Sequence, residues 1–353
     1  MCIRDSYDVV RWYRLLYEIK GSQPNTPKDW WELTGIWFII NNHSLPEWKE
    51  FKNLNASTIK ATYASLKAHR AIKESIPDWL DELGQAALSD GWSPTLSALN
   101  KTAPLVIRTN MLKTSRTDLQ RLLASKEILT KKYGEEALIL SKRTNLFRQP
   151  SFKQGFFEVQ DGGSQQIAPF LQVEPGMLVI DTCAGAGGKT LHLAALMKNK
   201  GRILALDIHE WKLKELRKRA KRAGIDIIET RPIINQKVIK RLKGKADRLL
   251  LDVPCSGLGV LKRNPDAKWK LDPTFLDRIK KTQQKILQSY PSMLKPNGLL
   301  VYATCSILPS ENQEQVHHFI EENKGTFTLL EEQHILPQEG FDGFYMALIR
   351  KEE

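Results

Sequence analysis

The sequence predicts an α/β fold in which helices cover both faces of an open, doubly wound sheet of mainly parallel strands. Three observations indicate this fold. From Met177 onward, short apolar runs alternate with helical patterns, and the first four runs each close on a polar residue, as buried parallel strands do. A glycine-rich turn follows the first run. Such sheets bind ligands beyond the carboxyl ends of their strands, so site residues are expected there.

The expected elements follow one another at short intervals. Five strands are predicted, at Met177–Asp181, Arg202–Asp207, Ile225–Thr230, Arg248–Asp252 and Leu299–Thr304. Helices are predicted between the first strands, each ending near a glycine, at Thr190–Met197 and Trp211–Ala223. A longer helix begins at Asp272–Pro273, with aspartate as its N-cap and proline at the first helical position. Another opens at Ser310, with Gln313 completing a capping box.

The first part of the chain has a different composition. Seven of the nine tryptophans lie within residues 1–92, where amphipathic patterns such as Ser57–Ala71 and Asp78–Leu88 predict short helices. We interpret these tryptophans as core residues of a small helical region.

A small β-α-β subdomain is predicted over residues 100–158. Its strands are expected at Pro104–Thr109, Ala137–Leu140 and Phe156–Gln160, and its helix begins after a capping box at Ser115.

The composition is that of an ordinary globular protein with a positive net charge. The 353 residues are 41% hydrophobic and 26% charged, with a formal net charge of +13. No apolar run approaches the roughly 18 residues of a membrane span, and the first residues lack the hydrophobic segment of a signal peptide. Four cysteines are too few for a disulfide framework. We therefore expect a soluble cytoplasmic protein whose charge favours, without deciding, a nucleic acid partner.

The sequence of the glycine-rich turn distinguishes between three kinds of ligand-binding loop. Asp181 closes the first strand and leads into Cys183–Thr190 (Cys-Ala-Gly-Ala-Gly-Gly-Lys-Thr), which opens a helix. Its glycines let a ligand approach the backbone, and the helix N-terminus offers N–H donors. A P-loop would need glycine where Cys183 stands, and a dinucleotide fingerprint would need it where Thr190 stands. The acidic-x-x-x-Gly-x-Gly loop of S-adenosylmethionine-dependent enzymes is matched completely.

Polar residues and thiols follow the other strands. Asp207 ends the second strand, where a carboxylate accepts ribose hydroxyls or caps the next helix; both interpretations stay open. Asn235 is the nearest polar residue after the third strand. The fourth strand delivers Asp252-Val-Pro-Cys255, and the fifth delivers Thr-Cys305-Ser, so both thiols are expected at one edge of the sheet. A lone cysteine is usually inert, but two at adjacent strand ends indicate chemistry. Neither has the ligand spacing of a zinc site.

These segments are similar to the RsmB–Nop–Sun family of S-adenosylmethionine-dependent RNA cytosine-C5 methyltransferases. The similarity is close over about Lys153–Lys351 and extends, less closely, from Pro104. The paired Pro-Cys-Ser-Gly and Thr-Cys-Ser motifs are specific when they occur together; the other segments that carry the similarity are Val159–Gln165, Asp181–Thr190, Arg263–Trp269 and Leu299–Gln315.

The resemblance implies a domain for each part of the chain. It implies a Rossmann-like class I methyltransferase domain at 159–353, with a seven-stranded, mainly parallel sheet. A ferredoxin-like RNA-binding subdomain at 100–158 and a helical region at 1–92, which could extend the RNA-binding surface, would precede it.

The resemblance also implies a role for each residue at the sheet edge. Cys305 would be the nucleophile that adds to carbon 6 of cytosine, and Cys255 would assist breakdown of the adduct and release of the RNA. Asp252 would contact the cytosine ring and touch the cofactor. Asp207 would hold the ribose, and Asn235 stands where the family has an acid on the adenosine. The cofactor's methionine would lie along the loop residues Cys183, Ala184, Gly185, Ala186, Gly187, Gly188 and Lys189; Ala186 replaces the family's usual proline.

The expected partner is RNA, foremost 16S-type ribosomal RNA and then transfer RNA, bound by a monomer. Phosphates and a flipped-out base are expected on the residues that follow the Cys255 loop, Lys262, Arg263, Lys268 and Trp269. Two other hypotheses stay open. One is a non-catalytic RNA-binding or ribosome-assembly protein on a methyltransferase scaffold, against which both cysteines and Asp252 argue. The other is a methyltransferase acting on DNA or a small molecule.

Overall fold

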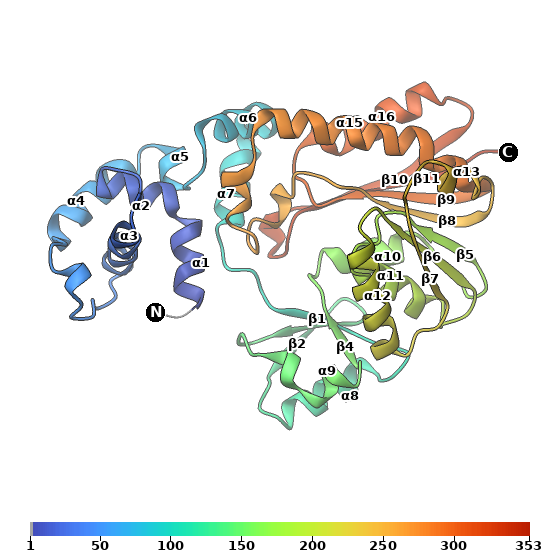
Figure 1. The fold of residues 1–353 in the computed structure, drawn as a ribbon, viewed down its shortest axis with the longest axis horizontal. Coiled ribbons are helices and arrows are strands. Elements are labelled where there is room, and N and C mark those ends of the chain that lie inside the picture. Colours follow the sequence, from blue (N-terminus) through green and yellow to red (C-terminus); the bar gives the residue numbers. More distant parts are fainter. Residues whose placement is uncertain (1–2) are drawn as a thin grey trace. The chain divides into compact units, whose positions relative to one another are not determined.

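The computed structural model describes residues 3–353, with side chains from Ser6 onward. The chain forms two compact units (Figure 1). The helical unit comprises residues up to Thr102 together with Leu261–Leu271, and the sheet unit comprises Ala103–Val260 and Asp272–Glu353. The segment Leu261–Leu271 thus belongs to the helical unit, although the sequence-based boundary placed it within the domain at 159–353.

The helical unit is built of short helices around an apolar core. Thr26 and Asp29 form a capping box at the start of its longest helix, α3. The indole of Trp92 is buried against Gly84, where a Cβ atom would lie 2.3 Å from the ring. Trp30 and Trp48 are exposed, so the tryptophans are only in part a core. The elements are α1 (Ile3–Arg11), α2 (Tyr13–Lys20), α3 (Pro27–Ile40), η1 (Lys49–Phe51), α4 (Ala56–Leu66), α5 (Arg70–Lys73), α6 (Asp78–Leu88), η2 (Ser89–Gly91), α7 (Trp92–Leu99) and α14 (Ala267–Lys270).

The sheet unit begins with a small antiparallel sheet in the order β2-β3-β1-β4. Ser115 caps its helix α8 by accepting from the Asp118 N–H at 3.1 Å, as the sequence predicts. The sequence did not predict β2, because Thr-Lys-Lys-Tyr lacks an apolar pattern. The elements are β1 (Val106–Thr109), α8 (Arg116–Ala124), β2 (Thr130–Tyr133), β3 (Ala137–Leu140), η3 (Leu146–Arg148), α9 (Pro150–Lys153) and β4 (Phe157–Val159).

The large sheet has seven strands in the order β10-β11-β9-β8-β5-β6-β7, which confirms the predicted seven-stranded, mainly parallel α/β fold. The contacts among β5 to β9 are parallel, and β10 and β11 add an antiparallel edge. Their bounds are β5 (Leu178–Asp181), β6 (Arg202–Asp207), β7 (Ile228–Pro232), β8 (Ala246–Asp252), β9 (Leu294–Thr304), β10 (Phe327–Ile335) and β11 (Phe344–Lys351).

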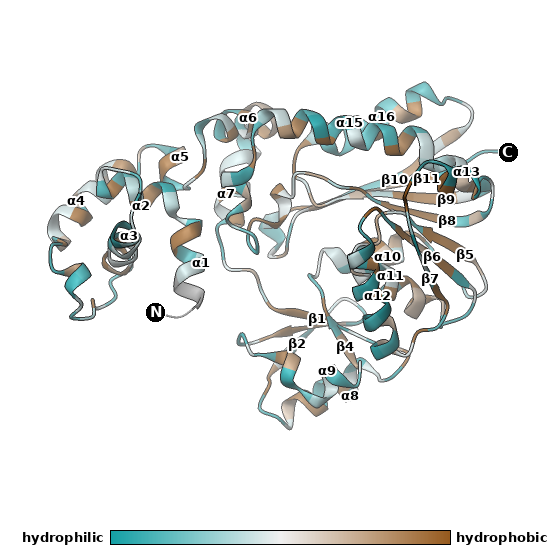
Figure 2. Cartoon of the chain, viewed as in Figure 1, coloured by the Kyte–Doolittle hydropathy of each residue, from teal (hydrophilic) through white to brown (hydrophobic). Residues whose placement is uncertain are grey.

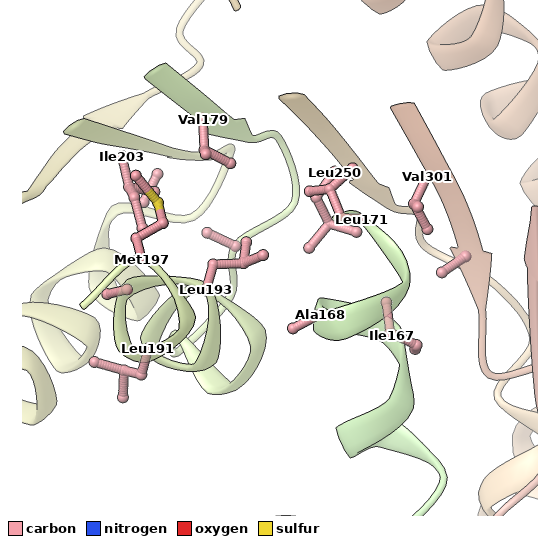
Figure 3. Packing of buried hydrophobic residues seen from close by; sticks show 14 of the residues in the cluster. Ile167, Ala168, Leu171, Val179, Leu191, Leu193, Met197, Ile203, Leu250 and Val301 are labelled. Atoms are coloured by element: carbon pink, nitrogen blue, oxygen red, sulfur yellow. The ribbon is translucent and has the colours of Figure 1, made fainter. Parts of the chain in front are cut away.

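Alternate residues of each strand face opposite helical layers. Val179 packs in the core with α10 (Ser164–Phe170), α11 (Gly188–Leu196) and α12 (Glu210–Ala223), as Figure 3 shows for α10 and α11. Its neighbour Ile180 belongs to the core on the other face, with α13 (Lys237–Lys240), α15 (Pro273–Ser289) and α16 (Gln313–Glu322). In Figure 2, β5 and β6 are hydrophobic and α12 is mostly hydrophilic. The remaining short turns are η4 (Leu258–Val260), η5 (Tyr290–Met293), η6 (Pro309–Glu311) and η7 (Pro337–Glu339).

Three predicted boundaries were wrong. The strand predicted to start at Leu299 begins at Leu294. The third strand begins at Ile228, because Gly224 adopts φ +73° and the Ile225 N–H bonds to the Ala220 carbonyl to end α12. Ser310 lies within η6, and α16 begins after Asn312 without a side-chain cap. No helix among residues 3–353 is long and apolar enough to cross a membrane.

Candidate active site

A cavity of about 630 Å³ opens at the carboxyl ends of β5, β6 and β8, where the fold class predicts a ligand site. The cavity is lined by the loops after β5, β6, β7 and β8 and by residues of α13, α15 and η5. The lining residues that matter here are Cys183, Gly185, Asp207, Ile208, Ile233, Gln236, Asp252, Pro254, Lys285 and Tyr290.

The glycine loop exposes its backbone to this cavity. Gly185 has φ +55°, and a Cβ atom there would project into open space, so a ligand can approach the main chain closely. Gly187, at φ +88°, serves packing instead, since a Cβ atom would lie 2.6 Å from Leu216 of α12. Of the predicted loop residues, Cys183 and Gly185 line the cavity; Ala184, Ala186, Gly187, Gly188 and Lys189 do not.

Two arginines hold the loop from outside. The Arg108 guanidinium, on β1, donates to the Gly188 carbonyl at 2.9 Å, and Arg219, on α12, donates to the Ala186 carbonyl at 2.8 Å. Arg219 also pairs with Glu158 of β4. The small sheet is therefore bonded to the loop at the cavity through buried charges.

Asp207 orders the loop and faces the cavity at once. Its carboxylate accepts the Gly185 N–H at 2.9 Å and the His209 N–H at 2.7 Å. The N-cap of α12 is His209, without a side-chain hydrogen bond, so the interpretation of Asp207 as the helix cap is wrong. Asp207 does line the cavity, and its contact with a ribose stays a prediction. Asn235 is turned onto its own loop, where it accepts the Lys237 N–H. It does not line the cavity, which Gln236 does instead, so this prediction is corrected.

Lys189 and Asp252 form an ion pair beside the cavity, with Nζ and Oδ2 2.7 Å apart. Burial acts to lower the pKa of Lys189, but the Asp252 carboxylate outweighs it and raises that pKa above the ordinary value. The predicted contact of Lys189 with the cofactor stays a prediction, and the structure adds its contact with Asp252.

The two predicted thiols lie together. Cys255 Sγ and Cys305 Sγ are 3.3 Å apart, and the Cys305 N–H donates to Cys255 Sγ at 3.3 Å. Both residues are partly exposed and unbridged. The hydrogen bond with Cys305 and burial raise the pKa of Cys255 well above its usual range. One thiol of the pair is thereby kept protonated.

Glu311 is a residue at this site that the sequence reasoning missed. It is fully buried, and it accepts hydrogen bonds from Ser256 and Ser306, the residues after the two cysteines. The available signal was the Pro-Ser-Glu-Asn run that begins four residues after Cys305.

The residues predicted to contact RNA lie in the helical unit, where most of them are buried or bonded to other residues of that unit. The side chains of Lys262 and Lys268 are buried; Lys268 Nζ donates to the Arg11 carbonyl at 2.8 Å, and burial lowers the pKa of Lys268 to about 7. Trp269 Nε1 donates to the Val10 carbonyl at 3.1 Å, and Arg263 is half-buried. The prediction of an open phosphate-binding surface is therefore corrected for Lys262 and Lys268, which are buried. Lys268 and Trp269 hold Leu261–Leu271 against α1, and an RNA contact of Arg263 stays a prediction.

Comparisons with known proteins place this arrangement among methyltransferases. The family described as "16S rRNA methyltransferase RsmB/F" matches residues 168–350. The ferredoxin-like domain described for RsmF/B-like methyltransferases matches residues 76–146.

Individual relatives agree with the family match. The chain is 36% identical over 255 residues to a probable ribosomal RNA small subunit methyltransferase B of Synechocystis, covering 71% of this chain and 57% of that protein. It is 33% identical to ribosomal RNA small subunit methyltransferase B of Vibrio cholerae, covering 82% and 68%. The chain thus spans little more than half to two thirds of these relatives. The crystal structure of PH0851 superimposes with a TM-score of 0.84 at 25% identity, covering 99% of this chain and 89% of that one.

Proposed function

The chain belongs to the 16S rRNA methyltransferase RsmB/F family, and on this premise we propose that it transfers a methyl group from S-adenosylmethionine to carbon 5 of a cytosine in RNA. The observation that carries the proposal is the Cys255–Cys305 pair, 3.3 Å apart. Asp252, which lines the neighbouring cavity, lies three residues before Cys255. A thiol nucleophile beside a cofactor cavity suits a base whose reacting carbon must first be activated.

The cavity suits S-adenosylmethionine in the chemistry of its lining. The Asp207 carboxylate has lone pairs left for ribose hydroxyls, and Gly185 offers open backbone to the methionine part. Ile208 and Ile233 provide an apolar surface for the purine, and Gln236 provides hydrogen-bonding groups where an acid was expected. When bound, this cofactor supplies an electrophilic methyl group to the substrate.

Cys305 activates the cytosine in this proposal. Its thiolate adds to carbon 6, a sulfur–carbon bond forms, and the ring's electron pair moves toward carbon 5, which becomes nucleophilic. Asp252 accepts a hydrogen bond from the exocyclic amino group, and a proton from its ion pair with Lys189 passes to ring nitrogen 3, which neutralises the negative charge that develops on the ring. Once carbon 5 carries the methyl group, a solvent water takes the carbon-5 proton, and the electron pair of that C–H bond restores the ring double bond and expels the Cys305 thiolate.

Cys255 acts in the second half of the reaction. Because its pKa is raised and its sulfur contacts Cys305, it carries a proton next to the leaving sulfur. We assign it to breakdown of the adduct and release of the RNA. The substrate we propose is small-subunit ribosomal RNA, as the names of the relatives indicate for those proteins.

Nucleoside mass spectrometry tests the function. Unmodified small-subunit ribosomal RNA and transfer RNA transcripts are incubated with protein and S-adenosylmethionine, and the digested nucleosides are analysed. We expect a 5-methylcytidine peak with the wild type and none with Cys305→Ala, while both proteins bind S-adenosylmethionine equally in calorimetry. Turnover by Cys305→Ala would overturn the nucleophile assignment. Cofactor binding without any methylated nucleoside would favour an assembly protein on this scaffold.

A further inference from the structure

Glu311 is a fully buried carboxylate beneath the two thiol loops. Its Oε2 accepts the Ser256 N–H at 2.8 Å and the Gln283 side-chain amide at 3.0 Å, and its Oε1 accepts the Ser306 hydroxyl at 2.5 Å. All three donors are neutral groups. They satisfy the carboxylate without neutralising its charge, so the charge acts on its surroundings in a medium of low dielectric.

The carboxylate connects the two loops to each other. Ser256 directly follows Cys255, and Ser306 directly follows Cys305, so one side chain binds the residue after each thiol. The two serine hydroxyls are also 3.2 Å apart. The Tyr302 hydroxyl donates to the Glu311 carbonyl at 2.7 Å, which fixes the backbone of this residue against β9. Several buried hydrogen bonds thus hold the two loops together and keep the thiols 3.3 Å apart.

The charged groups around the pair act unequally on the two sulfurs. The Glu311 carboxylate adds to the causes that raise the pKa of Cys255, after the hydrogen bond with Cys305 and burial. Tyr302, also close to Cys255, is neutral because burial raises its pKa well above the ordinary value. The Lys189 ammonium, paired with Asp252, interacts electrostatically with Cys305. Negative charge is therefore disfavoured on Cys255, and Cys305 has the one cation among these groups.

We propose that Glu311 is a positioning residue for the thiol pair. Its carboxylate sets the spacing of the two loops, and its charge keeps the proton on Cys255 while Cys305 gives its own proton to solvent. The Cys255 S–H then donates to the Cys305 thiolate, and the same proton is available when that sulfur leaves. The inference rests on the proposed function, because the Glu311 charge can influence the reaction only if one of the two thiols is the nucleophile.

Alkylation of the free protein tests this without any RNA. The native protein is treated with iodoacetamide at a series of pH values, and peptides containing Cys255 and Cys305 are quantified by mass spectrometry. In the wild type, we expect Cys305 to react at lower pH than Cys255. In Glu311→Gln, which keeps the size and removes the charge, we expect the rate ratio to fall about threefold or more. A one-unit change in pKa alters the thiolate fraction about tenfold, and reduced intrinsic nucleophilicity offsets part of it.

Two further variants separate charge from shape. Glu314→Gln changes an exposed acid of α16 in the same way and should leave the ratio at the wild-type value. Ser306→Ala removes one hydrogen bond to the carboxylate and keeps its charge, so Cys305 should remain the more reactive thiol. Folding of each variant is checked by S-adenosylmethionine binding.

The wild-type profile alone keeps the proposal testable if Glu311→Gln does not fold. Faster reaction of Cys255 in the wild type, or an unchanged ratio in a folded Glu311→Gln, would overturn the role of Glu311. Neither result depends on which nucleoside is methylated, so the proposed function would stand or fall separately.

Discussion

Lys189 Nζ lies 2.7 Å from Asp252 Oδ2, and this ion pair joins the glycine loop to the carboxyl end of β8. The two side chains are 14% and 26% exposed, so solvent screens the pair only partly. Lys189 lies in the first turn of α11, and Asp252 precedes the Cys255 loop. The pair therefore links the proposed cofactor site to the proposed thiol chemistry. Removal of either side chain would leave the other charge partly buried and without its partner.

Removing the ammonium should disturb the chemistry more than the binding of cofactor. In Lys189→Met the Cys305 thiolate loses a stabilising cation and Asp252 loses its partner, so we expect methyl transfer at pH 7 to fall about tenfold or more. The pH at which the rate reaches half its maximum should move upward. Single-turnover rates between pH 6 and 9 measure this. Lys198→Met, which alters an exposed lysine just after the same helix, is the matched control. An unmoved profile would show that Lys189 does not act on the nucleophile.

Loss of the second thiol should trap the reaction halfway. Cys255→Ala keeps Cys305 and Asp252, so addition to the base is expected to proceed while breakdown slows and the covalent RNA–protein complex accumulates. The complex should survive a denaturing gel and appear as a shifted RNA band. The double variant Cys255→Ala/Cys305→Ala should give no such band. A free RNA band with Cys255→Ala would mean that Cys255 has no part in release.

The convergence of Cys255 and Cys305 was predictable because it follows from a general property of parallel sheets. The carboxyl ends of neighbouring parallel strands meet at one edge, and β8 and β9 are neighbours. The strand patterns in the sequence were therefore enough to predict that these two residues, 50 positions apart, lie close together. The same argument placed Asp207 and the glycine loop at one cavity.

Contacts that no periodic pattern encodes were not predictable. Lys268 is bonded to the Arg11 carbonyl across 257 positions, and a lysine that follows the Cys255 loop has the same local sequence whether it is buried or exposed. The position of Glu311 likewise depends on hydrogen bonds from three donors on separate segments of the chain. Buried polar groups of this kind are specified by tertiary packing, which local propensity does not report.

Asp207 should set the affinity for the cofactor. In Asp207→Ala the Gly185 and His209 N–H groups lose their acceptor, and the proposed ribose contact is lost as well. The loss of the ribose contact, in a loop that is no longer held by these bonds, should cost about 1–3 kcal/mol of binding free energy, or roughly 5- to 150-fold in Kd. Titration calorimetry with S-adenosylmethionine measures it, and Asp226→Ala, an exposed acid before β7, is the control. Equal affinity for the wild type and Asp207→Ala would exclude Asp207 from the cofactor site.

Lys268 should make the stability of the helical unit depend on pH. Burial lowers its pKa to about 7, against an ordinary value near 10.5 in the unfolded chain. Between these two values the unfolded state binds more protons than the native state, so the free energy of unfolding rises with pH, by at most about 1.4 kcal/mol per pH unit. Below pH 7 both states are protonated, and the full cost of the buried charge remains.

Substitution by methionine isolates this contribution from other titrating groups. Eight of the nine tryptophans lie in the helical unit, so urea unfolding followed by tryptophan fluorescence reports on it. Between pH 7 and 9, the wild type should gain stability relative to Lys268→Met. Lys270→Met, at an exposed neighbouring position, should run parallel to the wild type. RNA affinity should be unchanged in a folded Lys268→Met, because the ammonium is bonded to the Arg11 carbonyl. A loss of RNA binding at unchanged stability would instead return Lys268 to the RNA-contacting surface that the sequence suggested.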